Sequence, residues 1–156
     1  MNSRKLTRGA MVVGLYIIIT YLLAPISFGP LQFRAAEALT VLPIIYPEAI
    51  PALFLAVLLA NILGGLGLID IIGGSLVTLL AAYLTYKFRK SFLAYLSPII
   101  LNGFLISIYL HMLFGLPYWL TVIQIAVSEA VVVFLIGYPL IKYLKSRINK
   151  ADHNQL

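Results

Sequence analysis

Short groups of basic residues separate long apolar runs along this chain, and this alternation constrains the fold more than any other feature. The three groups consist of Arg4, Lys5 and Arg8; of Lys87, Arg89 and Lys90; and of Lys142, Lys145, Arg147 and Lys150. A membrane-spanning helix needs about 20 mainly apolar residues, and Lys and Arg concentrate in the cytoplasmic loops beside such helices. The pattern therefore predicts a multi-pass protein surrounded by membrane lipid. It argues against nucleic-acid binding, because the basic residues form no continuous patch.

The composition supports a membrane-embedded protein. Of the 156 residues, 62% are hydrophobic and 10% are charged, whereas a soluble domain has about 45–50% apolar and roughly 25% charged residues. The chain has no cysteine, which removes disulfides and thiolate metal sites. We predict one transmembrane domain over residues 1–156, ending in a polar cytoplasmic tail from about residue 147. The basic start and apolar run at the N-terminus resemble a signal peptide but have no small-residue cleavage site, so they are interpreted as the first membrane helix.

Glycine, proline and charge divide the chain into six predicted helices and an all-α fold. These cover residues 6–24, 35–46, 49–63, 71–86, 92–114 and 118–143. Six spans place both termini and the loop after the fourth helix on one side, so all three basic groups face the cytoplasm. An odd number of spans would separate them. The second segment is short, which predicts that it is tilted, partly re-entrant, or carries its charges inside the membrane zone.

Glu129 in the sixth segment is the clearest candidate for a binding residue, because ionisable groups within membrane spans are costly and usually functional. It lies about eleven residues into the segment, or roughly 16 Å deep at 1.5 Å per residue. Thr121, Gln124 and Ser128 share one helical face, and Glu129 borders it. This polar stripe predicts a solute site that includes Gln124 and Glu129. The alternative is a structural hydrogen-bond network around Glu129.

The fifth segment adds a second polar candidate at the same depth. Asn102 matches Glu129 in depth and shares a face with Tyr109, whereas Ser107 and His111 lie nearly opposite. Asn102 is therefore preferred as a site residue. His111 is nearer the outer interface and is interpreted as a structural hydrogen-bonding residue.

Asn61 and Asp70 flank the glycine-rich sequence GGLGLID. Asp70 either caps the fourth helix through its carboxylate or contributes to a ligand site. Asn61 faces away from the small residues Ala52, Ala56 and Ala60, which can pack against another helix.

The sequence LQFRAAEALTVLPIIYPEAIP contains Arg34 and Glu37, three residues apart, and then Glu48. Arg34 and Glu37 can form a pair at this spacing, or either can meet a ligand. Glu48 is predicted on the cytoplasmic side. The acidic residues left in the predicted pocket region, Glu37, Asp70 and Glu129, outnumber Arg34. This excess of acceptors favours a cationic or donor-rich solute. A guanine-like edge offers two parallel donors to a carboxylate, although other cationic rings satisfy the same criteria.

A flat ring could stack on an aromatic face, for which Phe28, Phe33, Tyr118 and Trp119 are candidates. Enzyme motifs are missing from the chain: there is no P-loop, no G-x-S-x-G elbow and no second aspartate within a span to pair with Asp70. With only two histidines, a metal site has poor support. We therefore predict that the chain is not an enzyme, has no ATPase motif of its own and holds no metal or cofactor.

The motifs APISFGP, QFR-x-x-EAL, YPEAIP and LLAN-x-x-GG occur in this order, and the chain resembles the QueT family over residues 8–90 and more loosely to about residue 145. These queuosine-precursor transporters are S-components, the substrate-binding subunits of energy-coupling-factor (ECF) transporters. The resemblance implies six transmembrane helices in a prokaryotic plasma membrane and a pocket near the extracellular face, fed by the loop after the first helix. It implies a transmembrane coupling subunit and two cytoplasmic ATPase subunits as partners.

The resemblance implies a 7-deazaguanine ligand such as preQ0, preQ1 or queuine. It also implies docking to the coupling subunit through small residues of the first helix, where Ala10-x-x-x-Gly14 is the nearest match to the Ala-x-x-x-Ala pattern of S-components. The predicted substrate-binding residues are Arg34, Glu37, Asn61, Asp70, Asn102, Trp119, Gln124 and Glu129. Three alternatives stay open: an S-component for another vitamin-like heterocycle, a structural membrane subunit, and a standalone proton-coupled carrier.

Overall fold

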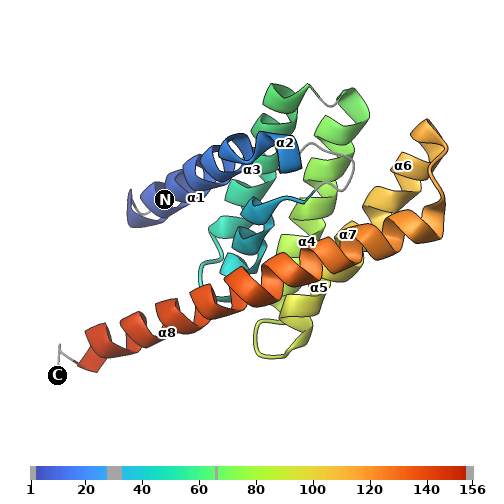
Figure 1. The fold of residues 1–156 in the computed structure, drawn as a ribbon. Coiled ribbons are helices and arrows are strands. Elements are labelled where there is room, and N and C mark those ends of the chain that lie inside the picture. The colour runs from blue at the N-terminus through green and yellow to red at the C-terminus, as the bar shows by residue number, and fades with distance from the viewer. Residues whose placement is uncertain (1–2, 28–32, 66, 154–156) are drawn as a thin grey trace.

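The computed structural model describes residues 3–27, 33–65 and 67–153, and the regular structure within these ranges is helical (Figure 1). The first half contains α1 (Ser3–Leu22), α2 (Ala24–Ser27), the 3-10 helix η1 (Ala35–Ile44), α3 (Ala49–Gly64), the π-helical segment η2 (Asp70–Gly74) and α4 (Ser75–Lys87). The second half contains α5 (Leu93–Leu101), the π segment η3 (Asn102–Ile106), α6 (Ser107–Phe114), α7 (Tyr118–Val132), the π segment η4 (Val133–Gly137) and α8 (Tyr138–His153).

The segments join into rods that correspond to the predicted helices. In the described chain, α5, η3 and α6 form one continuous helix, and α7, η4 and α8 form another. The all-helical prediction is therefore confirmed for the described residues. Ser3–Leu22, Leu93–Phe114 and Tyr118–Lys150 are long and apolar enough to cross a membrane. The six-span topology and its orientation stay predictions.

The last rod is longer than predicted. It does not end near residue 143, because α8 continues to His153. This extension carries Lys145, Arg147 and Lys150, which are exposed. Lys and Arg are good helix formers, and their charge suits the C-terminal end of a helix. The predicted polar tail is thus helical as far as the described residues reach.

The 3-10 helix η1 lies at the centre of the fold. Residues 36–44 are all buried, and η1 packs against α1, α3, α4, α5 and η4. Its ten residues reach roughly 20 Å at about 2.0 Å per residue, against about 15 Å for an α-helix of equal length. The predicted second segment, which is short for a membrane span, is therefore an extended 3-10 helix buried among the other helices.

Glycine permits a close helix contact in the core. A Cβ on Gly137 of η4 would lie 3.0 Å from Val41 Cγ2 and 3.1 Å from the Ala38 carbonyl oxygen of η1. Such distances leave no room for a methyl group beside a backbone oxygen. The hydrogen atom of Gly137 lets η4 rest directly on η1.

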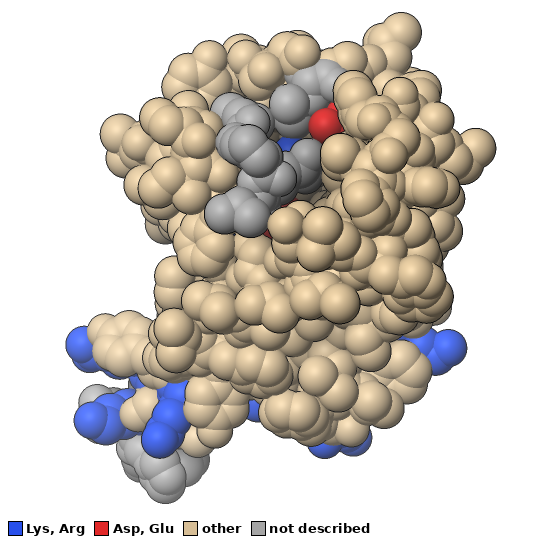
Figure 2. All heavy atoms as spheres, turned by 45° about the vertical axis from the view of Figure 1, so that its right-hand side comes forward, with Lys and Arg blue, Asp and Glu red and all other residues tan. Residues whose placement is uncertain are grey.

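One end of the molecule is basic. Arg8 forms a salt bridge of 3.3 Å with Glu48, and its guanidinium lies 4.6 Å from the centre of the Tyr46 ring. These contacts tie α1 to the turn before α3 and place Glu48 beside the first basic group. Figure 2 shows most of the visible Lys and Arg side chains at the lower end of the molecule, while the opposite end has a hollow with acidic and basic atoms inside.

Gly137→Ala should destabilise the protein. Alanine favours a helix by about 1 kcal/mol over glycine, but overpacking against η1 costs about 1–3 kcal/mol. The melting temperature of the purified protein in detergent measures the net effect. Gly14→Ala is the matched control, because nothing lies within 4 Å of a Cβ at that position. A Gly137→Ala variant as stable as the Gly14→Ala variant would contradict the close contact.

Candidate functional site

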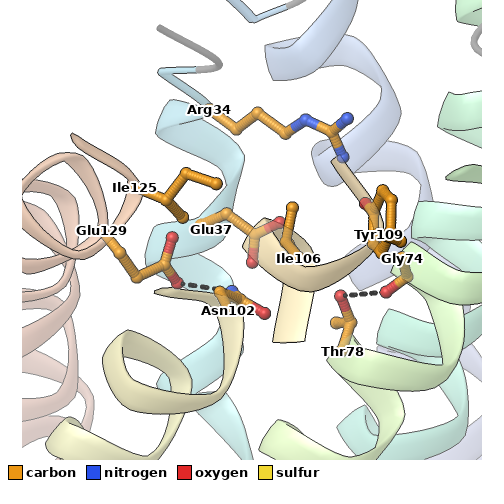
Figure 3. Close-up of a pocket in the computed structure, with 9 residues that line it drawn as sticks. All are labelled: Arg34, Glu37, Gly74, Thr78, Asn102, Ile106, Tyr109, Ile125 and Glu129. Carbon is orange, nitrogen blue, oxygen red and sulfur yellow. Dashed lines mark hydrogen bonds between the residues drawn. The ribbon is translucent and has the colours of Figure 1, made fainter. Parts of the chain in front are cut away.

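Four rods enclose a small cavity lined by charged, amide and apolar side chains (Figure 3). The lining residues are Arg34, Glu37, Gly74, Thr78, Asn102, Ile106, Tyr109, Ile125 and Glu129. The cavity volume is about 20 Å³, which is roughly enough for one water molecule. The structure thus brings together four of the predicted site residues: Arg34, Glu37, Asn102 and Glu129.

Glu37 lies in the first turn of η1 and is 5% exposed. Its Oε1 accepts a 2.5 Å hydrogen bond from the hydroxyl of Tyr16, a fully buried residue of α1. Its backbone is also held, because the N–H donates to the Arg34 carbonyl at 3.0 Å and the carbonyl accepts from Thr40 Oγ1 at 2.6 Å. Glu37 Oε2 is buried and has no hydrogen-bond partner among the described residues. This oxygen is an acceptor without a partner among the described residues, on a side chain that lines the cavity.

Glu129 and Asn102 form a second buried pair. Asn102 Nδ2 donates to Glu129 Oε1 at 3.0 Å, and both side chains are buried. The other Glu129 oxygen points away from Asn102 in Figure 3. Asn102 Oδ1 is buried without a hydrogen-bond partner in the described part of the chain. The pair therefore offers a carboxylate oxygen and an amide oxygen, both of which can accept hydrogen bonds.

Asp70 lies behind the cavity wall and is linked to it through Tyr109. The Tyr109 hydroxyl donates to Asp70 Oδ1 at 2.6 Å, and Asn61 Nδ2 donates to the Asp70 backbone carbonyl at 2.8 Å. Asp70 thus bonds across to α6, instead of serving the helix-cap role considered from the sequence. Asp70 and Asn61 are not among the lining residues. A Cβ on Gly74 would lie 3.0 Å from Asn61 Nδ2, so glycine admits this amide.

Arg34 immediately precedes η1 and is buried. Figure 3 shows its side chain extending across the cavity, with the guanidinium end on the side of Tyr109. Arg34 therefore brings positive charge to a cavity that also contains the Glu37 and Glu129 carboxyl groups. This location is compatible with both roles predicted for Arg34, a pair with Glu37 and a contact with a ligand.

Two predicted site residues lie elsewhere. Gln124 is exposed on α7, because Ile125 and Glu129, four residues apart, take the side of the helix that faces the cavity. The prediction that the polar stripe through Gln124 forms part of the site was therefore wrong. Trp119 is 68% exposed and packs edge-on against Tyr118 at 5.2 Å between ring centres. An exposed Trp at a helix end is typical of the membrane interface.

The aromatic wall also differs from the prediction. Tyr109 lines the cavity, while Phe33 and Tyr118 are not among the lining residues, and Phe28 lies outside the described residues. His111 is exposed, and its Nδ1 lies 2.6 Å from the Leu116 carbonyl oxygen. That contact agrees with the structural interpretation of His111.

Several residues that contribute to the site were not predicted from the sequence. Tyr16 shares a helical face with Val12 and Thr20 at four-residue spacing, and the structure buries all three, but this spacing does not reveal the partner of its hydroxyl. Tyr109 was placed on the face of Asn102 but was not selected. Four further lining residues have no feature in the sequence that marks them as part of a site: Gly74, Thr78, Ile106 and Ile125.

The predicted docking residues lie on α1 away from the cavity. Ala10 is exposed, and nothing lies within 4 Å of a Cβ built on Gly14. A partner helix could therefore approach the backbone of α1 closely here. Among the described residues, no group of three or more His, Cys, Asp or Glu side chains could hold a metal ion.

Comparison with known proteins identifies the family. No curated protein and no solved structure matches the chain. The family model described as QueT transporter matches residues 6–146. This range contains every residue that lines the cavity. Because the match covers nearly the whole sequence, the chain belongs to the QueT transporter family.

Proposed function

We propose that this protein is the substrate-binding S-component of an ATP-driven ECF importer for a 7-deazaguanine precursor of queuosine. The observation that carries the proposal is the cavity, where Arg34, Glu37, Asn102 and Glu129 are buried together inside an apolar, helical protein. Buried ionisable groups at membrane depth are costly and mark substrate sites. In the proposed topology six helices span a prokaryotic plasma membrane, with the basic end in the cytoplasm and the cavity toward the outside.

The cavity matches the hydrogen-bonding pattern of a guanine-like edge. Glu129 and the Asn102 amide oxygen supply adjacent acceptors for the ring N–H and the exocyclic amino group, and Glu37 Oε2 supplies a third acceptor. Arg34 can donate to the ring carbonyl. Ile106, Ile125 and Tyr109 provide apolar and aromatic surfaces for the flat ring. In this arrangement Asn61 supports the site through Asp70.

Ligand binding requires the cavity to widen. Ligand pockets usually measure about 300–1,000 Å³, far more than the cavity volume of about 20 Å³. Arg34 is the longest lining side chain and crosses the cavity, so its rotation opens the most space. The guanidinium would then exchange its position near Tyr109 for a contact with the ligand.

Transport is proposed to depend on partners. A coupling subunit docks on α1 at Ala10 and Gly14, where the helix backbone is accessible. Two cytoplasmic ATPase subunits hydrolyse ATP, and the whole S-component topples in the bilayer to release its ligand inside. The ATPase subunits would supply the energy for transport. This chain has no P-loop, so it does not itself hydrolyse ATP in the P-loop manner.

Glu129→Gln should abolish or strongly weaken ligand binding. The change removes a charged acceptor, and a hydrogen bond to a charged group is worth about 1.5–3 kcal/mol, so Kd should rise at least about tenfold. Thermal-shift titration of the purified protein with preQ0, preQ1, queuine, thiamine and pyridoxine measures binding. Gln124→Ala, on the exposed side of the same helix, should behave like the wild type. Stabilisation by thiamine or pyridoxine with no response to deazaguanines would refute the proposed substrate.

Asp70→Asn should discriminate between two precursors. The aminomethyl cation of preQ1 is proposed to reach Asp70 past Tyr109 once the cavity has widened. The neutral nitrile of preQ0 gains nothing from that carboxylate. The Kd for preQ1 should rise about tenfold or more, and the Kd for preQ0 should change by no more than about twofold. Isothermal titration with both compounds provides its own control. Equal losses for the two ligands would exclude Asp70 as the partner of the cation.

Gly14→Trp should separate binding from transport. The indole would occupy the open face of α1 and keep a partner helix away. Purified Gly14→Trp protein should bind its ligand with unchanged Kd, while uptake by cells containing the complete importer should fall at least about tenfold. Leu22→Trp, at a highly exposed position of the same helix, is the matched control. Full uptake in cells without the ATPase subunits would instead support a standalone carrier.

A further inference from the structure

We propose that Tyr16 is a positioning residue for substrate recognition. It holds one oxygen of Glu37 against α1, so that the other oxygen of that carboxylate accepts a hydrogen bond from the ligand. This inference rests on the proposed function, because it names the residue that prepares one of the proposed acceptors. It extends the site beyond the cavity wall to the first helix.

Tyr16 is anchored where a hydroxyl needs a partner. It is 0% exposed, with Val12 and Thr20 beside it on the buried face of α1, whereas Met11 and Leu15 are exposed on other faces of the helix. Water is scarce at such a position, and a buried tyrosine hydroxyl normally finds a hydrogen-bond partner. The Tyr16 hydroxyl donates to Glu37 Oε1 at 2.5 Å.

The second Glu37 oxygen is the observation that points to a ligand. Glu37 Oε2 is buried and has no hydrogen-bond partner among the described residues, although Glu37 lines the cavity. Leaving a buried carboxylate oxygen unsatisfied costs free energy. A ligand donor that enters the cavity removes this cost, so the unsatisfied oxygen favours a donor at that point.

The backbone of Glu37 is already fixed, which leaves the side chain as the remaining freedom. Its N–H donates to the Arg34 carbonyl at 3.0 Å, and its carbonyl accepts from Thr40 Oγ1 at 2.6 Å. Without the Tyr16 hydroxyl, the Glu37 carboxylate could rotate and turn toward other donors such as Arg34. The Tyr16 bond thus reduces the conformational freedom lost when ligand binds.

The same arrangement recurs at the other two carboxylates. Asn102 donates to one oxygen of Glu129, and Tyr109 donates to one oxygen of Asp70. Asn102 and Tyr109 also line the cavity and can touch the ligand themselves, but Tyr16 is not among the lining residues. Tyr16 therefore acts through Glu37, which makes it a positioning residue.

A double-mutant cycle between Tyr16→Phe and Glu37→Gln tests the inference, with preQ1 as the probe and Kd as the readout. Tyr16→Phe should weaken binding roughly tenfold, the change expected when one hydrogen bond of typical net worth is lost. Glu37→Gln should weaken binding further. Adding Tyr16→Phe to Glu37→Gln should change Kd by no more than about twofold. With the amide oxygen of glutamine on the Tyr16 hydroxyl, an NH2 group replaces the oxygen that accepts from the ligand, so no ligand acceptor is left to orient.

Tyr21→Phe is the matched control on the same helix. The Tyr21 hydroxyl lies 3.5 Å from the Leu63 carbonyl oxygen and is exposed, so its removal should leave Kd unchanged. The melting temperature without ligand is recorded for every variant, to separate loss of folding from loss of binding. If Tyr16→Phe does not fold, Tyr16→Met replaces it as a second variant without a hydroxyl.

Two results would overturn the role of Tyr16. One is an unchanged Kd in the folded hydroxyl-free variant. The other is an additive cycle, in which Tyr16→Phe costs the same factor with glutamate or glutamine at position 37, because a general packing defect does not depend on that carboxylate. If the wild type binds thiamine or pyridoxine instead of deazaguanines, the proposed substrate is wrong. The same cycle then runs with that compound as the probe, and its outcome still decides the role of Tyr16.

Discussion

Carboxylates inside an apolar helical bundle need donors from the protein, and the arrangement of this molecule depends on that requirement. In hydrocarbon no water completes the shell of a buried polar group. Glu37, Glu129 and Asp70 each receive a hydrogen bond from a neutral side chain of another rod: Tyr16, Asn102 and Tyr109, respectively. These bonds cross between helices, so they fix relative positions that nonspecific apolar contacts would leave free. The same polar cluster thus forms the candidate site and fixes the relative positions of the helices.

Departures from α-helical geometry gather at the same place. Glu37 lies on a 3-10 helix, Asp70 and Gly74 lie on one π segment, and Asn102 and Ile106 lie on another. Irregular backbone at membrane depth is tolerated where protein surrounds it, and π segments often mark functional sites. The third π segment, η4, supports the site from behind through the Gly137 contact with η1.

The sequence predicted the order and approximate limits of the rods that the described residues form, because apolar length and punctuation are local properties. It also placed Glu129 and Asn102 at one depth, since rise per residue is constant in a helix. The prediction from sequence was wrong where the direction of a side chain depends on the neighbouring helices. Gln124 and Ile125 are adjacent in the chain, yet only Ile125 lines the cavity. Tyr16 was missed because its partner lies 21 positions away, beyond any helical repeat. The end of α8 was missed because charged residues were taken to end the helix.

The 3-10 geometry of η1 has a rotational consequence. With three residues per turn, side chains three positions apart lie directly above one another, so Glu37, Thr40 and Pro43 follow one edge of the helix. Each added or removed residue turns the following part by about 120°, whereas an α-helix would turn by about 100°. An insertion at position 38 would swing the remainder of η1 by a third of a revolution relative to Glu37. The number of residues in η1 is therefore constrained as well as their identity, because its buried side chains must keep their directions.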